Sequence, residues 1–210
     1  APQVHVGADA VEAGVAAAHE IAAACSRAAA QHGRVRMLFA SAPSQQHMLD
    51  ELRTLDIDWS VIEAFHVDEY VGLDATDPRG FGAWLRERLF DRVPIGALRF
   101  INPRPVDVAA EAERYGALLA SAPIDVACIG IGVNGHIAFN EPYEWEIEGG
   151  PLVARVRLHD ASRQQQVDDK CFDALDEVPH EALTLTVPAI LRAGEIIVTV
   201  PGPEKADAVA

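Results

Sequence analysis

The stretch RVRMLFASAPSQQHMLDELRTL, residues 34–55, contains a candidate strand, a turn and a candidate helix in succession. Its first part, residues 34–40, is short and mostly apolar, as expected for a strand buried on both faces. Residues 44–55 then show helical spacing, because apolar side chains recur at Leu49, Leu52 and Leu55. A buried strand followed by a helix is the unit from which parallel sheets are built.

The same alternation continues on both sides of this stretch. Helical spacing is found over residues 8–32, 79–93 and 106–121, and Gly33 stands where the first helix needs a left-handed C-terminal residue. Further strands are predicted at residues 61–67, 98–101, 124–129, 152–158 and 195–200, and residues 183–191 are also mostly apolar. We therefore predict a single domain over residues 1–210, with an α/β fold of three αβα layers: a Rossmann-like, doubly wound and mostly parallel sheet between helices.

Composition restricts the classes of function. The chain has 210 residues, of which 50% are hydrophobic, and 32 acidic against 17 basic residues give a formal net charge of -15. Such a charge argues against binding to the phosphates of nucleic acid. No apolar run approaches the roughly 20 residues that span a bilayer, and no secretory signal is evident, so we expect a soluble cytoplasmic protein without membrane partners.

The three cysteines, Cys25, Cys128 and Cys171, are far apart and form no C-x-x-C pair. This spacing suggests neither a disulfide framework nor a thiolate zinc site. We expect buried free thiols.

Ligands of parallel α/β sheets bind at the carboxyl ends of the strands. This rule selects four segments of the chain. They are residues 41–44, 68–70, 130–141 and 201–205.

The segment GIGVNGHIAFNEP, residues 130–142, directly follows a predicted strand. Gly130, Gly132 and Gly135 fit the G-x-G-x-x-G pattern of dinucleotide sites, in which a long helix follows. Pro142 interrupts too soon for that helix, and the segment lies far from the first strand, so this interpretation is disfavoured. The glycines are better suited to a loop that passes close to a small polyol or phosphate.

This loop would bring His136 and Glu141 toward one another. A histidine beside a carboxylate can shuttle protons near neutral pH, because the carboxylate fixes the tautomer and supports the imidazolium. The alternative is a structural histidine in a tight turn, and the pair alone leaves both open.

Asp68 and Glu69 directly follow the end of a predicted strand. Successive strand side chains point to opposite sides, so we expect only one of the two carboxylates to face a cleft. A partly buried carboxylate is a candidate general base for a proton next to a carbonyl. The alternative is a pair of solvated turn acids.

An anionic ligand would need local donors on so acidic a chain. Ser41 and Ser44 lie between a strand and a helix, where hydroxyls and backbone N–H groups bind phosphate well. Lys205 and Arg163 are further candidates, although each alone is more often a solvated surface charge. The pair His66-x-Asp68 lacks a recognisable third metal ligand, and no G-x-S-x-G hydrolase motif is present.

Three runs carry a family resemblance: FHVDEYVGL at residues 65–73, GIGVNGHIAFNEP at 130–142, and ALTLTVPAILRAGEIIVTVPGPEKADAV at 182–209. In this order they resemble the glucosamine-6-phosphate deaminases, also called isomerases. The related 6-phosphogluconolactonases share the glycine-histidine turn but usually continue differently where this chain has IAFNEP. The resemblance implies the sugar-phosphate isomerase type of the fold and no metal or organic cofactor.

The resemblance also implies a reaction, in which glucosamine 6-phosphate and water give fructose 6-phosphate and ammonia. His136 would open the pyranose ring, Glu141 would orient it, and Asp68 would carry a proton between carbons 2 and 1. Lys205 and Arg163 resemble the phosphate-binding lysine and arginine of the family. The candidate set is Asp68, Asn134, His136 and Glu141 for catalysis, and Ser41, Ser44, Gln45, Glu69, Gly132, Gly135, Arg163 and Lys205 for substrate binding.

Three features depart from the family pattern. Asn134 stands where many members have an aspartate, so the imidazole of His136 loses one anionic neighbour. The segment SAPSQQ, residues 41–46, replaces a glycine-glycine-threonine phosphate loop, which suggests a divergent branch in which Arg163 carries more of the phosphate site. The chain also stops soon after Lys205, whereas the family continues. We therefore expect a longer natural protein, and an intact mass matching 210 residues would contradict this.

Two other functions compete with deamination. A 6-phosphogluconolactonase or other sugar-phosphate isomerase would keep Asp68 and His136 but release no ammonia. A sugar-phosphate sensor would bind without turnover, but the helix-turn-helix with a basic face that often accompanies such domains is not visible. In each case we expect a small sugar phosphate as partner, and a homo-oligomer is possible.

Overall fold

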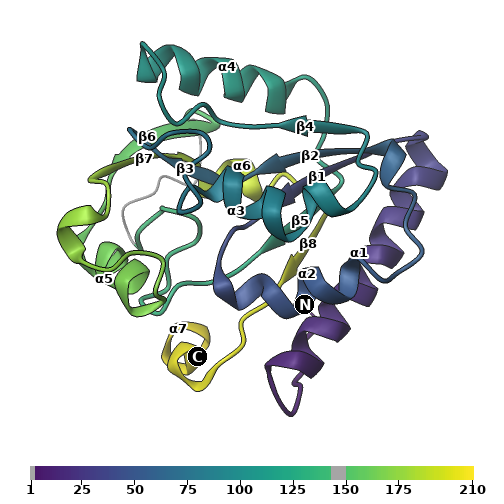
Figure 1. Cartoon of the computed structure of the whole chain (residues 1–210). Coiled ribbons are helices and arrows are strands. Elements are labelled where there is room, and N and C mark those ends of the chain that lie inside the picture. Colours follow the sequence, from purple (N-terminus) through teal and green to yellow (C-terminus); the bar gives the residue numbers. More distant parts are fainter. Residues whose placement is uncertain (1–2, 143–149) are drawn as a thin grey trace.

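The computed structural model describes residues 3–142 and 150–210 and has a five-stranded sheet at its centre (Figure 1). The strand order is β4-β2-β1-β5-β8, and every neighbouring pair is parallel. The strands are β1 (Val35–Phe39), β2 (Ile62–His66), β4 (Ala97–Arg99), β5 (Val126–Ile129) and β8 (Glu195–Val198). The predicted α/β fold with a mostly parallel sheet is confirmed, and all five carboxyl ends lie at one edge.

A second sheet was not predicted. It has three antiparallel strands in the order β3-β7-β6, formed by β3 (Asp68–Tyr70), β7 (Glu181–Leu185) and β6 (Val153–Arg157). Asp68 therefore lies inside a strand opposite Thr184, and not in a loop after β2. The short β3 makes the chain turn from the main sheet into the second one directly at the carboxyl end of β2.

Helices and the second sheet cover the two faces of the main sheet (Figure 1). The α-helices are α1 (Ala10–His32), α2 (Gln46–Leu52), α3 (Phe81–Arg88), α4 (Val108–Ala120), α5 (Asp160–Asp168), α6 (Val187–Ile190) and α7 (Ala206–Val209). Short 3-10 helices are η1 (Pro43–Gln45), η2 (Trp59–Val61), η3 (Phe90–Arg92), η4 (Leu175–Glu177) and η5 (Pro203–Lys205). Among the described residues, no helix is both long and apolar enough to cross a membrane.

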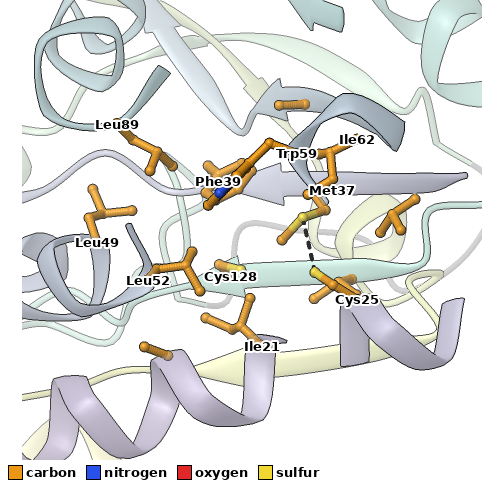
Figure 2. Close-up of a cluster of buried hydrophobic side chains, with 14 of the residues drawn as sticks. Ile21, Cys25, Met37, Phe39, Leu49, Leu52, Trp59, Ile62, Leu89 and Cys128 are labelled. Carbon is orange, nitrogen blue, oxygen red and sulfur yellow. Dashed lines mark hydrogen bonds between the residues drawn. The ribbon is translucent and has the colours of Figure 1, made fainter. Parts of the chain in front are cut away.

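The core follows the alternation of side chains along the strands. On β1, Met37 and Phe39 pack with α1, α2 and α3 on one face, whereas Leu38 packs with Tyr115 of α4 on the other. Figure 2 shows the first of these clusters, in which the Cys25 Sγ lies 3.4 Å from the Met37 Sδ. The cysteines are free thiols, as expected, although Cys171 is only half-buried.

The first helix ends as the sequence predicts. Asp9 caps it by accepting a hydrogen bond from the backbone N–H of Glu12, and Gly33 has a φ of 69°. The Gly33 N–H donates to the Ala29 carbonyl at 2.8 Å. A left-handed glycine directly before β1 turns the chain from helix to strand without steric cost.

Several predicted elements are shorter than expected. The helix expected at 79–93 is divided into α3 and η3, because Leu89 has a φ of -134°, outside the helical region. The apolar segment 183–191 contains the end of β7 and the whole of α6. The polar run around Arg163, for which no element was predicted, lies within α5.

Candidate active site

A pocket lies at the carboxyl edge of the main sheet. All four segments that the strand-end rule selected contribute to its lining. The lining residues are Ala40, Ser41, Ala42, Pro43, Ser44, Gln45, Val67, Asp68, Phe81, Gly130, Ile131, Gly132, His136, Ala138, Phe139, Gln165, Gln166, Asp169 and Lys205. The site is therefore built from the loops after β1 and β5, from the start of β3 and the residue before it, from α3 and α5, and from the segment after β8.

Asp68 is a buried carboxyl group in the pocket lining, with 6% of the residue exposed. Pairing of β3 with β7 fixes its backbone opposite Thr184. Burial raises the pKa of Asp68 well above its usual value, and the charge of Glu69 raises it further. A carboxylate with a raised pKa is a stronger base than an exposed one.

Glu69 points away from the pocket and into the start of α3. Its Oε1 accepts hydrogen bonds from the backbone N–H groups of Tyr70 at 2.9 Å and Phe81 at 3.1 Å, and its Oε2 accepts one from Gly82 at 2.8 Å. Burial raises the pKa of Glu69 to about 7, although these hydrogen bonds oppose the shift. The expectation that Glu69 binds substrate does not fit this geometry, since successive strand residues alternate and only Asp68 faces the pocket.

His136 belongs to a network of four side chains. Its Nδ1 lies 2.7 Å from Asn134 Oδ1 and 3.3 Å from Ser162 Oγ. Asn134 Nδ2 donates to Glu141 Oε2 at 2.7 Å, and Ser162 Oγ donates to Glu141 Oε1. Glu141 thus acts on the imidazole through Asn134 and Ser162, each of which contacts both groups. The expected approach of Glu141 to His136 is realised through these two intermediates.

The Asn134 amide determines the tautomer of His136. Its nitrogen donates to the Glu141 carboxylate, so its oxygen faces the ring as an acceptor. Nδ1 of His136 therefore carries a proton, and Nε2 keeps a lone pair. Burial lowers the pKa of His136, although the Glu141 charge opposes this shift, and the resting ring at neutral pH is a neutral base.

Two glycines make the turn around His136 possible. A Cβ at Gly132 would overlap the imidazole ring, so this position has space only for glycine. Gly135 has a φ of 89°, a left-handed conformation that favours glycine. Gly132 lines the pocket and Gly135 lies in the turn behind it, so both shape the site without offering a side chain.

The Ser41–Gln45 loop is held by Gln45. The Gln45 Nε2 donates to the carbonyl of Thr199 at 3.1 Å and to Ser44 Oγ at 3.3 Å, and so joins the loop after β1 to the end of β8. A Cβ at Gly130 would lie 2.9 Å from this nitrogen, so the glycine makes room for it. Ser41 Oγ and Gln45 Oε1 are buried without a partner in the described part of the chain. Buried polar atoms of this kind are available to a ligand.

Lys205, at the end of η5, is the lysine in the pocket lining, and 7% of the residue is exposed. Burial lowers the pKa of Lys205, whereas the charge of Asp169 raises it. Gln165 fixes the opposite side: its Nε2 donates to Asp169 Oδ2 at 3.3 Å, and its Oε1 accepts from the Val133 N–H at 3.2 Å. Helix α5 is thereby attached to the glycine-rich turn.

Arg163 does not line the pocket. Its guanidinium lies 3.1 Å from Asp160 Oδ1 and donates to the carbonyls of Leu175 at 2.6 Å and Val178 at 3.0 Å. The expectation that Arg163 carries much of a phosphate site therefore does not fit the structure. The side chain instead attaches α5 to η4.

The contribution of α5 to the site was not predicted from the sequence. Ser162, Gln165 and Gln166 reach the site from α5 and Asp169 reaches it from the C-cap of this helix, whereas Phe81 and Phe139 add apolar lining. The signal was present in the polar run that follows the predicted strand at 152–158, but its low apolar content gave no helical period.

His66 accepts a hydrogen bond from the Ile101 N–H at 2.8 Å and is fully buried. Across residues 3–142 and 150–210, no group of three His, Cys, Asp or Glu residues is arranged to hold a metal ion.

Comparison with known proteins gives consistent results. The profile of the family described as glucosamine-6-phosphate isomerases/6-phosphogluconolactonase matches residues 8–210. The chain is 32% identical over 178 residues to a Bacillus cytotoxicus protein named glucosamine-6-phosphate deaminase, covering 84% of this chain and 66% of that protein. It is 35% identical over 159 residues to a Streptococcus suis protein of the same name, covering 75% and 65%. The chain thus spans slightly less than two thirds of these two relatives.

A solved structure shows how far the fold is shared. It is described as a monomeric glucosamine-6-phosphate deaminase, and it matches with a TM-score of 0.89 at 27% sequence identity. The match covers 99% of this chain and 86% of that one.

Proposed function

The chain belongs to the family of glucosamine-6-phosphate isomerases and 6-phosphogluconolactonases, and we infer that it is an amino-sugar phosphate deaminase. The proposed reaction converts glucosamine 6-phosphate and water to fructose 6-phosphate and ammonia. One observation carries the proposal: a buried carboxyl group, Asp68, and a neutral imidazole, His136, line the same pocket. A carboxylate can move a proton between adjacent carbons, and an imidazole can open a sugar ring.

In this mechanism His136 opens the ring. Its Nε2 takes the proton of the anomeric hydroxyl, and the resulting imidazolium gives a proton to the ring oxygen, so the bond between C1 and that oxygen breaks and C1 becomes an aldehyde. Between these transfers His136 is an imidazolium. Asn134 stabilises it by accepting a hydrogen bond from Nδ1, and Glu141 stabilises it by its negative charge. A neutral resting histidine suits this step, because it must first accept a proton.

Asp68 then isomerises the open chain. Its carboxylate removes the proton from C2, while the aldehyde oxygen takes a proton from the substrate ammonium group, giving an enolamine. The Asp68 carboxyl returns its proton to C1, which leaves an iminium ion at C2. Water adds at C2 and ammonium leaves, so the product is the 2-ketose. The raised pKa of Asp68 strengthens it as the base of the first transfer.

The substrate phosphate is proposed to lie between Lys205 and the Ser41–Ser44 segment. A protein with a formal net charge of -15 attracts an anion only through local groups. Lys205 offers an ammonium, and the buried Ser41 hydroxyl is free to donate to a phosphate oxygen.

Asp68 also favours deamination over the lactonase reaction of the same family. Hydrolysis of a lactone needs an activated water, but no proton moves between neighbouring carbons. A pure sensor would need neither a basic carboxylate nor an oriented imidazole. The position of Asp68 in the pocket lining suits a proton transfer between neighbouring carbons, and release of ammonia distinguishes deamination from the other reactions that could use this carboxylate.

The test is release of products by the full natural protein. We expect equal amounts of ammonia and fructose 6-phosphate from glucosamine 6-phosphate. Galactosamine 6-phosphate and 6-phosphogluconolactone are assayed beside it. Turnover of the lactone alone would reassign the protein to the lactonases, and binding of the sugar phosphates without turnover would support a sensor.

A further inference from the structure

Ser162 is a buried hydroxyl that the reaction scheme above does not use. It lies on α5, only 1% of the residue is exposed, and its Oγ contacts both Glu141 and His136. Resting on the proposed function, we propose that Ser162 is a positioning residue for ring opening. It holds Glu141 and His136 in one fixed arrangement from α5.

The hydrogen bonds around Ser162 leave little freedom. A serine hydroxyl has one proton, and here that proton goes to Glu141 Oε1, so the oxygen lone pairs are left for the Nδ1–H of His136. Glu141 Oε2 accepts a hydrogen bond from Asn134 Nδ2, and Asn134 Oδ1 accepts one from His136 Nδ1. Each carboxylate oxygen thus has its own donor, and the Nδ1 proton has two acceptors.

Replacing Ser162 by alanine would leave Glu141 Oε1 without that donor in a site where Glu141 is 9% exposed. A buried charged group that loses a hydrogen bond shifts toward another partner or toward water. The carboxylate would then no longer be fixed on the Asn134 amide that orients the imidazole. Ser162 is outside the pocket lining, so it acts through His136 and not on the sugar.

The same helix also forms one wall of the pocket. Gln165, Gln166 and Asp169 line the site from α5 and its C-terminal end, within about two helical turns of Ser162. A shift of α5 would therefore move the wall and the histidine network together. This arrangement ties correct protonation of His136 to the position of the helix that faces the substrate.

The kinetic test compares S162A with Q164A, which alters the exposed face of the same helix. We expect S162A to lower kcat on glucosamine 6-phosphate by about ten- to a hundredfold with KM within about twofold, and Q164A to match the unmodified protein. Because ring opening alone is slowed, the isotope effect with substrate deuterated at C2 should fall toward one in S162A. Full turnover in S162A, or reduced turnover with an undiminished isotope effect, would overturn the proposal.

A measurement without substrate separates this proposal from the proposed function. Nitrogen-15 NMR of the free protein should show a protected Nδ1 proton on His136, and S162A should exchange that proton at least about tenfold faster than Q164A. An unchanged exchange rate would refute the role of Ser162 even if the protein proved to act on another sugar phosphate. If S162A exchanges the proton faster but the native protein releases no ammonia, the proposed function fails, whereas the positioning of the His136 imidazole by Ser162 stands.

Discussion

Among single residues, Asp68 offers the clearest separation of chemistry from binding. Asp68→Asn keeps the size and the buried position but removes the base. We expect turnover to fall by a factor on the order of a hundred to ten thousand, the usual contribution of a positioned general base, with little change in substrate affinity. Steady-state kinetics and calorimetric binding of the substrate would measure the two effects. Unchanged turnover would remove Asp68 from the proposed mechanism.

Asn134 controls the charge beside His136. In Asn134→Asp, a carboxylate replaces the amide oxygen 2.7 Å from Nδ1, so the pKa of His136 should rise. As the pH falls, the imidazole of the variant would then become protonated at a higher pH than in the unmodified protein. The acid limb of the kcat/KM profile should therefore move to higher pH. The variant also loses the donor to Glu141, so we expect a lower maximum rate. A profile with an unmoved acid limb would show that His136 is not the titrating base.

The sequence indicated some site residues and not others for reasons that lie in their positions. Asp68 and His136 lie in segments that begin at the ends of predicted strands, so the rule of strand ends selected them. The same rule could not decide between Asp68 and Glu69 without the register to Thr184. Ser162 lies 26 positions from His136 and meets it only because α5 folds back over the glycine-rich turn. Its neighbour Arg163 points to η4 instead, because consecutive side chains leave a helix in different directions.

Among the elements, the crossing of α1 and α2 places a strict demand on one glycine. A Cβ at Gly14 would lie 2.7 Å from the Cβ of His47 and 2.8 Å from the backbone N of Met48. We expect Gly14→Ala to lower the free energy of unfolding by about 1–2 kcal/mol, because crowding outweighs the gain of about 1 kcal/mol in helix propensity. Since α2 directly follows the Ser41–Gln45 loop, substrate KM should also rise.

The control for this prediction is Gly116 on α4. Among the residues that the structure describes, a Cβ there would meet only the Leu152 Cβ, at 3.9 Å, so Gly116→Ala should raise the free energy of unfolding by about 0.5–1 kcal/mol. Urea unfolding of the two variants measures both changes. If both alanines stabilise the protein, the crossing tolerates the extra methyl group and the packing argument fails.

Helices and strands were predictable from the sequence where the spacing of apolar residues repeats over enough positions to be recognised. The strands of the main sheet and the helices α1 and α4 show clear apolar patterns over their lengths. The strand β3 has three residues and exists only because β7, more than a hundred residues later, pairs with it. The helix α5 is polar on most sides, and contacts of Arg163 and Ser162 with other segments stabilise it in place of a broad apolar face. Such elements depend on tertiary contacts that no local pattern contains.

For the whole molecule, two buried groups make stability depend on pH in opposite directions. Burial lowers the pKa of His66 from 6.5 to about 3, so the unfolded chain binds a proton there that the folded protein refuses. Stability from His66 is present above pH 6.5 and is lost as the pH falls toward 3. Glu69 has a raised pKa of about 7 against 4.5, so the folded protein keeps a proton that the unfolded chain releases. Its contribution is present below pH 4.5 and is lost as the pH rises through 7.

The variant Glu69→Gln should therefore remove the loss of stability that Glu69 causes as the pH rises from 4.5 to 7. Relative to the unmodified protein, its free energy of unfolding should improve steadily between pH 4.5 and 7, by up to about 3 kcal/mol in total, and stay level outside that window. A constant offset is expected as well, because an amide offers one acceptor oxygen where Glu69 uses two. His66→Gln, which keeps an acceptor for the Ile101 N–H, should differ in pH dependence only below pH 6.5. Urea unfolding at intervals of one pH unit distinguishes the two pH ranges. If the free energies of unfolding of Glu69→Gln and of the unmodified protein run parallel against pH, Glu69 ionises at the same pH in the folded and in the unfolded chain.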